Sequence, residues 1–275
     1  MEIKRIWKIY FSATGTTEKI VSRVADELGI AFSIKPLSYN FTTPDSRNSF
    51  PDLTCDDLVV FGCPTYAGRL PNLLLKYLNS ICGNDALAVP VVTFGNRAFD
   101  NSLIELRNIL ENNGFHTIAA GAFSCEHSFS YKLGAGRPDA EDLKFASKFS
   151  FGITGKLAKI LTSGVIPEPI QVSGDASADY YKPRDRHGVF IDIRKVKPKT
   201  SDKCTDCGLC ADLCPMGAID YYNVRNINGI CIKCGACIKK CPNSAKYFDD
   251  EGYLYHKKEL ESMYGSERQS NTMFL

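Results

Sequence analysis

The chain has almost no excess of charge of either sign and no long apolar run. Its 275 residues include 33 Lys and Arg against 31 Asp and Glu, which gives a net charge of +2. This balance argues against a nucleic-acid or membrane-surface partner. No stretch approaches the roughly 18 to 20 apolar residues of a spanning helix, and the apolar start from Ile6 to Phe11 is broken by Lys8 and lacks a cleavage-type site. We therefore expect no membrane span and a first strand near the start of the chain.

Cysteine, in contrast, is abundant, with 12 residues in the chain. Eight of them repeat the pattern Cys-x-x-Cys-x-x-Cys-x-x-x-Cys-Pro, first at Cys204, Cys207, Cys210 and Cys214 and then at Cys231, Cys234, Cys237 and Cys241. This spacing is typical of two-cluster ferredoxins, in which three thiolates of one loop ligate a 4Fe-4S cluster and the fourth ligates the cluster of the other repeat. The pattern therefore predicts two clusters with crossed ligand sets: Cys204, Cys207, Cys210 and Cys241, and Cys231, Cys234, Cys237 and Cys214.

Other uses of cysteine fit this pattern less well. Structural zinc usually takes two separated Cys-x-x-Cys pairs, a disulfide framework needs an oxidising compartment, and a thioredoxin-type redox pair needs only two thiols. The two halves also match at Gly208 with Gly235 and at Ala218 with Ala245, which indicates an internal duplication. Each half is too short to bury a core alone, so metal binding is expected to supply much of the folding free energy. So many reduced thiols favour a cytoplasmic location.

The first 164 residues alternate strand-like and helix-like segments. Strands are expected over residues 3–11, 57–62, 88–94 and 116–123, and helices over 16–28, 70–81, 101–113 and 139–161. This alternation predicts an α/β domain with a doubly wound parallel sheet. Ligands of such sheets bind in the loops that follow the carboxyl ends of the strands. We therefore look for a binding site in those loops.

The loop after the first strand places hydroxyls around a glycine and then opens a helix. Its residues are Ser12, Ala13, Thr14, Gly15, Thr16 and Thr17. Hydroxyl groups, a glycine for close approach and the amides of a helix N-terminus together favour a phosphate site, although simple capping of the helix is the alternative. The loop lacks the Gly-x-Gly-x-x-Gly of dinucleotide binders and the Gly-Lys-Ser/Thr of P-loop proteins. The expected ligand is therefore a mononucleotide.

Three loops, in order along the chain, resemble those of flavodoxins. Residues 12–17 are similar to the flavodoxin phosphate loop, residues 63–69 to the second flavin loop and residues 94–100 to the third, within a resemblance that spans about residues 3–160. With the cysteine repeat, the chain resembles the flavodoxin-ferredoxin fusion proteins of anaerobic microbes. The resemblance implies FMN, with its phosphate on residues 12–17 and its isoalloxazine ring between the other two loops. The ring-binding candidates are Pro64, Thr65, Tyr66, Ala67, Gly68, Arg69, Phe94, Gly95, Asn96, Arg97 and Phe99.

The chemistry of those two loops suits a flavin ring, which is apolar on its faces and polar along one edge. Tyr66 and Phe99 are candidate covers of a ring face, and Asn96 with the amides of nearby glycines is a candidate partner of the polar edge. Arg97 could place positive charge near the reduced ring. Each residue also has a structural alternative, because Tyr66 could pack against its own turn, Phe99 could face the core and Arg97 could be solvated.

The segment after the last expected strand of the sheet contains His127. A histidine beside a flavin could donate a proton to a substrate, or it could be a neutral hydrogen-bond partner, which is more common. The adjacent Cys125 is expected to be a buried small apolar residue rather than a nucleophile. Downstream, Arg137 is a candidate contact for an anion, in a stretch that turns the chain into the next helix.

The rest of the chain divides around the cysteine repeats. We expect a flavodoxin-like domain over residues 1–164, a linker or wrapping arm over 165–197 and a small α+β ferredoxin-like domain over 198–249. Residues 250–275 are expected to form a C-terminal tail that begins as a helix and then frays, and no chemistry is assigned to it.

A flavin and two clusters in one polypeptide would convert between two-electron and one-electron chemistry. The leading hypothesis is an electron-transfer flavoprotein that exchanges electrons with soluble redox proteins. The alternative is a flavin-dependent oxidoreductase acting on a small molecule or a nicotinamide, with the clusters as an internal relay. A third interpretation, a partner-docking domain without flavin, is disfavoured by the three intact loops.

Overall fold

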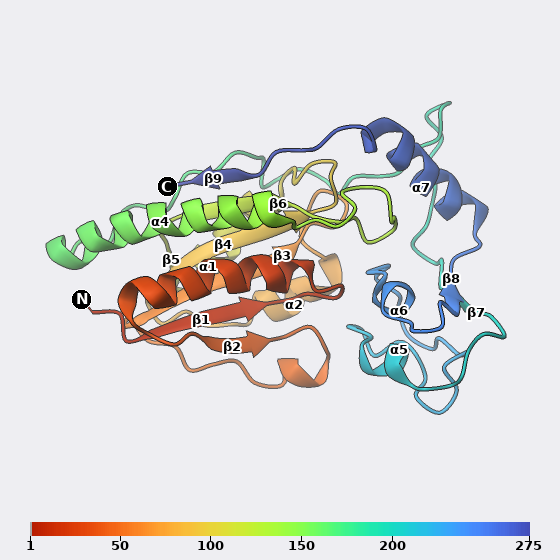
Figure 1. Ribbon diagram of the computed structural model, residues 1–275, viewed down its shortest axis with the longest axis horizontal. Helices are drawn as coiled ribbons and strands as arrows, with labels where there is room; N and C mark the ends of the chain where they lie inside the picture. Colours follow the sequence, from red (N-terminus) through yellow and green to blue (C-terminus); the bar gives the residue numbers. More distant parts are fainter. Residues whose placement is uncertain (1) are drawn as a thin grey trace.

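The computed structural model describes residues 2–275 and has two parts (Figure 1). The larger part is an α/β sheet flanked by helices. The smaller part, which carries the cysteine repeats, lies beyond the carboxyl ends of the parallel strands. The strands of the larger part are β1 (Arg5–Tyr10), β2 (Leu37–Asn40), β3 (Asp57–Pro64), β4 (Leu87–Phe94), β5 (His116–Thr117), β6 (Ala120–Ser124) and β9 (Thr272–Phe274).

The sheet order is β2-β1-β3-β4-β6-β9, and β5 also pairs with β4. Strands β1 to β6 pair in parallel, with Ile9 opposite Phe61 and Val60 opposite Val89, while β9 pairs antiparallel with β6. The order of the first five positions is that of flavodoxin-like doubly wound sheets. The expected fold class is therefore confirmed, and the loops after β1, β3, β4 and β6 meet at one edge.

Helices cover both faces of this sheet. Helices α1 (Thr16–Phe32) and α4 (Ala140–Ser163) pack together on one face (Figure 1). The other face is covered by α3 (Ser102–Asn112) and by a short turn made of η2 (Asn72–Leu74) and α2 (Leu75–Leu78). All residues of β4, and all of β3 except Pro64, are buried. Burial on both faces explains why these two strands have apolar runs rather than an alternating pattern.

Two expected elements differ in detail. The helix expected over 70–81 is reduced to η2 and α2, and it begins only after Pro71, whose conformation is extended with ψ of 112°. The single strand expected over 116–123 is divided into β5 and β6. The interruption lies opposite Val89 and Pro90 of β4, and a proline has no amide hydrogen to donate to a neighbouring strand.

The cysteine-rich part contains only short elements. These are β7 (Lys199–Thr200), α5 (Leu209–Asp212), α6 (Ala236–Lys239) and β8 (Lys246–Tyr247), and β7 pairs antiparallel with β8. Another short helix, η1 (Asp45–Arg47), lies in the α/β part between β2 and β3. The pairing of β7 with β8 brings the two ends of the duplicated segment together. The chain thus has the two parts that were expected: a parallel sheet covered by helices, and a small cysteine-rich part.

The expectation that the tail frays is wrong. After helix α7 (Glu251–Tyr264), the chain runs back to the α/β part and adds β9 to the edge of the sheet (Figure 1). Ala120 pairs with Phe274 and Ala122 with Thr272. The open edge of β6 offers unpaired backbone groups that a short β-forming segment can satisfy. No helix among residues 2–275 is both long and apolar enough to cross a membrane.

Candidate functional site

The first loop follows β1 and leads into α1, as its sequence predicts. Gly15 adopts a left-handed conformation with φ of 97° at the N-cap position, and no side chain caps the helix there. Ser12 Oγ accepts a hydrogen bond from the Glu18 amide at 3.0 Å, and the hydroxyls of Thr17 and Thr93 lie 2.7 Å apart. Two of the loop's four hydroxyls are therefore used within the fold. The other two, from Thr14 and Thr16, line a cavity.

That cavity has a volume of about 430 Å³ and lies between the two parts of the chain. The first loop and α1 contribute one wall, the segment after β6 a second, and the end of α6 a third. The lining residues are Thr14, Gly15, Thr16, Lys19, Glu126, Tyr131, Gly136, Arg137, Pro138, Lys239 and Lys240. A β-carbon added to Gly15 would meet no atom within 4 Å, so the loop backbone is open to a ligand.

The second and third loops lie side by side. Loop 63–69 makes a tight turn in which the amides of Tyr66 and Arg69 donate to each other's carbonyls at 2.8 and 3.1 Å. The Asn101 amide donates to Gly68 O at 2.9 Å and ties this turn to the third loop. A β-carbon on Gly68 would come within 2.7 Å of an Asp100 carboxylate oxygen, so the close approach of the two loops requires glycine here.

The segment between the two parts wraps over these loops. The Tyr181 amide donates to Ala67 O at 2.8 Å, and the Tyr180 hydroxyl donates to Leu70 O at 2.8 Å. The guanidinium of Arg97 lies 4.8 Å from the centre of the Tyr181 ring, which is a cation–π contact. Arg69 pairs with Glu105 at 2.7 Å. Both arginines therefore contact the linker, and each is also paired with a carboxylate, Arg97 with Asp100 and Arg69 with Glu105.

Asn96, a candidate partner for the polar edge of the flavin ring, already uses its side-chain hydrogen bonds within the protein. Its side-chain amide donates to Tyr264 O at 2.9 Å and to Glu267 O at 2.7 Å, and its side-chain oxygen accepts from the Gln269 amide at 3.2 Å. Asn96 is only 2 % exposed. It therefore anchors the C-terminal tail. Phe99 packs against Phe94, with ring centres 5.7 Å apart.

His127 lies over Gly95, where a β-carbon would come within 2.2 Å of the imidazole ring. Its Nδ1 accepts a hydrogen bond from the Phe129 amide at 3.0 Å. Burial, with a smaller contribution from the charge of Lys239, lowers the pKa of His127 to about 3. The ring is therefore neutral near pH 7 and acts as a hydrogen-bond acceptor rather than as a proton donor. Burial likewise raises the pKa of the Cys125 thiol, as a small buried apolar residue requires.

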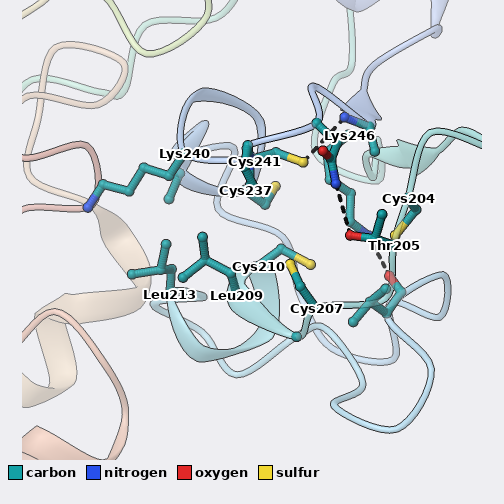
Figure 2. Close-up of a pocket in the computed structure, with 16 residues that line it drawn as sticks. Cys204, Thr205, Cys207, Leu209, Cys210, Leu213, Cys237, Lys240, Cys241 and Lys246 are labelled. Carbon is teal, nitrogen blue, oxygen red and sulfur yellow. Dashed lines mark hydrogen bonds between the residues drawn. The ribbon is translucent and has the colours of Figure 1, made fainter.

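The eight cysteines of the repeats surround two cavities. We call them the outer cavity, lined by Cys204, Cys207, Cys210 and Cys241, and the inner cavity, lined by Cys214, Cys231, Cys234 and Cys237. Cys237 also reaches the outer cavity. Figure 2 shows the sulfur of Cys241 across the outer cavity from those of Cys207 and Cys210. The fourth cysteine of each repeat thus lies with the first three of the other repeat.

The local backbone explains this arrangement. Each ligand loop has two left-handed residues, Asp206 and Gly208 in the first repeat and Lys233 and Gly235 in the second. Helices α5 and α6 begin directly after the two glycines. The sulfur of the last cysteine in each repeat accepts a hydrogen bond from the backbone amide four residues later in the chain. Ala218 donates to Cys214 and Ala245 donates to Cys241, each at 3.3 Å. No group of three or more His, Cys, Asp or Glu side chains in residues 2–275 is placed to hold a single metal ion.

Two buried lysines support a negatively charged occupant of these cavities. Lys246, which is 3 % exposed, lines the outer cavity and donates to Thr200 Oγ1 at 2.7 Å. Lys233 lines the inner cavity and donates to Cys231 O at 2.9 Å. Neither forms an ion pair with a carboxylate within residues 2–275. A cluster held by four thiolates carries net negative charge and would balance these ammonium groups, so the donor set fits the group.

The inner cavity lies against the α/β part, whereas the outer cavity lies toward solvent. Cys234 is 7 % exposed, and burial raises the pKa of its thiol to about 12. Burial, followed by the negative charge of the Cys234 thiolate, raises the pKa of Tyr66 well above its usual value. Cys234 and Tyr66 belong to the same hydrophobic cluster. Cys207, in contrast, is exposed.

Lys239 at the end of α6 fastens the two parts together. Its ammonium donates to the carbonyls of His127 at 2.7 Å and Ser130 at 2.8 Å, and it pairs with Glu126. A β-carbon on Gly235 would come within 2.5 Å of Ser128 O, so the two backbones are in close contact. Neither Lys239 nor its neighbour Lys240 was among the site residues expected from the sequence. Their only sequence signal is a pair of lysines directly before Cys241.

Comparisons with known proteins found similarities to each part of the chain. Residues 203–246 match the family described as "4Fe-4S dicluster domain". A flavodoxin from the domain Archaea is similar over 56 % of this chain and 99 % of its own, with 11 % identity and a TM-score of 0.40. A Streptococcus pneumonia TIGR4 flavodoxin (16 % identity) and Flavodoxin 2 from Bacillus cereus (17 %) cover the same shares, each with a TM-score of 0.39. No curated protein matches the chain.

At these scores, the strand order of the sheet rather than the structural likeness identifies the larger part as flavodoxin-like. The family match supports the iron-sulfur interpretation of the cysteine repeats. The chain therefore joins a flavodoxin-like α/β part to a 4Fe-4S ferredoxin-like part, as its sequence led us to expect.

Proposed function

We propose that this protein is an electron-transfer flavoprotein that binds FMN in its α/β part and two 4Fe-4S clusters in its cysteine repeats. The observation that carries the proposal is the crossed arrangement of eight cysteines around two cavities, the inner one of which lies against the second flavin loop. When bound, FMN supplies a two-electron store and the clusters supply one-electron carriage. The proposed ligand sets are Cys204, Cys207, Cys210 and Cys241, and Cys214, Cys231, Cys234 and Cys237.

The protein's own residues would hold the flavin nucleotide at the first three loops. Thr14, Gly15 and Thr16 offer hydroxyls and open backbone amides at the N-terminus of a 17-residue helix, where an anion is favoured. Tyr66 packs against the hydrophobic cluster of the α/β part, and the linker residue Tyr181 bonds to the second loop through its amide. Because Asn96 is committed to the tail, backbone amides of the second and third loops are the better candidates for the polar edge of the ring.

The flavin loops, the inner cavity and the outer cavity follow one another in this order through the molecule. Tyr66 of the second loop and Cys234 of the inner cavity belong to the same hydrophobic cluster, the two cavities share Cys237, and the exposed Cys207 lines the outer cavity. This order would place a soluble redox partner at the outer cavity. It also supports a relay in which the cysteine-rich part is the contact for other proteins. Reduced, unpaired cysteines throughout the chain favour a cytoplasmic location.

The alternative, an oxidoreductase acting on a small molecule, has less support. Of the polar residues after β6, His127 is held neutral by burial and Arg137 is paired with Asp142 at 2.6 Å. Lys132 is mostly exposed and lies outside the cavity lining. The cavity between the two parts remains the one feature that favours a substrate, and a reductant test separates the two functions.

The test is an anaerobic preparation with flavin and iron quantified, followed by additions of NADH, NADPH and dithionite. The proposal expects about one FMN and about eight iron atoms per chain, with bleaching by dithionite or by a reduced low-potential carrier. Rapid bleaching by a nicotinamide would instead favour the oxidoreductase. A preparation without stoichiometric FMN would rule the proposal out.

A further inference from the structure

The cavity beside the first loop is lined by cations from both parts of the chain. Lys19 comes from α1, Arg137 from the segment after β6, and Lys239 and Lys240 from the end of α6, while Glu126 is the one carboxylate among the lining residues. Four positive groups therefore face one negative group. A cavity with this excess of positive charge favours an anionic ligand.

Two of the four cations are already neutralised. Arg137 makes a bidentate pair with Asp142, with N–O distances of 2.9 and 2.6 Å, and Lys239 pairs with Glu126. Lys19 donates only to a carbonyl, Pro138 O, at 2.7 Å. Lys240 has no hydrogen bond or ion pair from its ammonium within residues 2–275. Two positive charges at the mouth of the first loop are thus unmatched.

The orientation of Lys240 matches this role. Figure 2 shows its side chain extending away from the cysteine sulfurs of the outer cavity, toward the α/β part. The residue lines both the outer cavity and the cavity beside the first loop. Its ammonium therefore lies on the same side as Thr14, Gly15 and Thr16, which line the same cavity.

We propose that Lys240 and Lys19 complete the phosphate site of the flavin nucleotide, so that the cofactor is bound by both parts of the chain. The proposal rests on the FMN site of the proposed function. It adds that the cysteine-rich part supplies a positioning charge for the phosphate monoester. The ligand class is a dianionic phosphate ester, for which two ammonium groups and the N-terminus of α1 offer direct charge complementarity.

Phosphate binding at Lys240 would also affect the position of neighbouring cysteines. Segment 236–241 carries Lys240 together with Cys237 and Cys241. A bound phosphate would therefore hold the same segment that presents two thiols to the outer cavity. Binding of the nucleotide and docking of the two parts are then expected to favour each other, because free-energy coupling between two sites is reciprocal.

The test compares FMN with riboflavin, which lacks the phosphate. Flavin is removed from the full-length protein, intact iron content is verified, and each ligand is titrated by quenching of flavin fluorescence. Lys240→Gln should weaken FMN binding about five-fold while leaving riboflavin binding unchanged, and Lys19→Gln should have a similar effect. Lys240→Arg should restore most of the affinity for FMN. The matched control is Lys258→Gln, an exposed lysine of α7 outside the cavity lining.

The possible outcomes distinguish the interdomain phosphate site from the flavin proposal on which it rests. Unchanged FMN affinity in Lys240→Gln, with normal binding by the native protein, overturns the interdomain phosphate site and leaves the flavin proposal intact. Equal weakening of FMN and riboflavin also overturns it, because the variant would then act on the fold and not on the phosphate. Failure of the native protein to bind either flavin overturns both proposals.

Discussion

The two parts of the molecule are stabilised in different ways. The α/β part has six fully buried phenylalanines and two hydrophobic clusters, one on each face of its sheet. The cysteine-rich part has helices of four residues and strands of two, and its buried apolar residues are few and mostly small. Burial of apolar surface can hold the first part together without a ligand. The second part is too small for that, so its ligands must supply the difference.

The contacts between the two parts are also of a different kind from those within the sheet. Lys239 bonds to the carbonyls of the segment after β6, and Arg47 donates to the carbonyl of Pro215. These are polar bonds between residues more than 100 positions apart in sequence. The placement of the cysteine-rich part thus combines directional polar bonds with apolar packing of Cys234 and Ala236 against the α/β core, whereas the sheet depends on many non-directional contacts.

The sharpest test of this contrast is removal of iron. Anaerobic chelation should abolish protection from amide exchange across residues 198–249 while leaving strands β1, β3 and β4 protected, because only the first region relies on metal ligation. Hydrogen-exchange mass spectrometry measures both regions in one experiment. Equal loss of protection in both regions would mean that the sheet also depends on the clusters.

The crossed sets predict which cluster each cysteine supports. Cys241→Ala should remove the outer cluster and about half of the iron, and Cys214→Ala should remove the inner cluster. Redox-resolved EPR with iron analysis distinguishes the two results. The control is Cys82→Ala, because Cys82 is exposed and lies outside both cavities. Loss of the inner cluster in Cys241→Ala would contradict the crossed assignment.

The tail contacts predict that Asn96 positions residues outside its own loop. Asn96→Ala leaves the carbonyls of Tyr264 and Glu267 without their donor, at a cost of about 2 kcal/mol. Amide exchange over residues 265–275 should therefore become more than ten-fold faster. Asn72→Ala, at an exposed position, is the matched control. An unchanged tail in Asn96→Ala would show that β9 and the other tail contacts, such as the Arg268–Asp139 pair, hold it without Asn96.

Two histidines, the buried His256 and the half-buried His127, predict a loss of stability in mild acid. Burial lowers the pKa of His127 to about 3 and that of His256 to about 4, so both stay neutral in the folded protein. Below the unfolded pKa of about 6.5, the unfolded chain takes up protons that the folded chain excludes, and stability falls by up to about 1.4 kcal/mol per pH unit for each histidine. Denaturant midpoints at pH 7.5 and 5.5 measure the loss. His256→Asn should reduce this pH dependence, and an unchanged slope would exclude His256 as its source.

The smallest expected effect concerns the charge beside the outer cavity. Lys246→Met removes a buried ammonium and should lower the reduction potential of the outer cluster by roughly 60 mV, because reduction adds negative charge that Lys246 stabilises. A redox titration followed by EPR measures the shift. Lys195→Met, at an exposed lysine, is the control. Identical potentials in the two variants would remove Lys246 as an electrostatic contributor.

Several features were predictable because they depend on neighbours in sequence. The cysteine spacing sets the geometry of each ligand loop, so Cys204, Cys207 and Cys210 come together wherever the loop lies. The alternation of apolar strands with amphipathic helices likewise predicts the parallel sheet, since β3 and β4 are buried on both faces. The loop at residues 12–17 was recognisable because a strand, a glycine and a helix follow one another directly.

By itself, the sequence determined the ligand spacing, the α/β order and the position of the first loop, because these follow from local backbone geometry and short-range periodicity. The tertiary structure alone decided that Asn96 holds the tail, that β9 pairs with β6, that Tyr66 and Cys234 share one hydrophobic cluster and that Lys240 lines the cavity beside the first loop. Each of these contacts joins segments far apart in the chain. Such contacts leave no periodic signal in sequence, because they are fixed by how whole elements pack and not by the residues beside them.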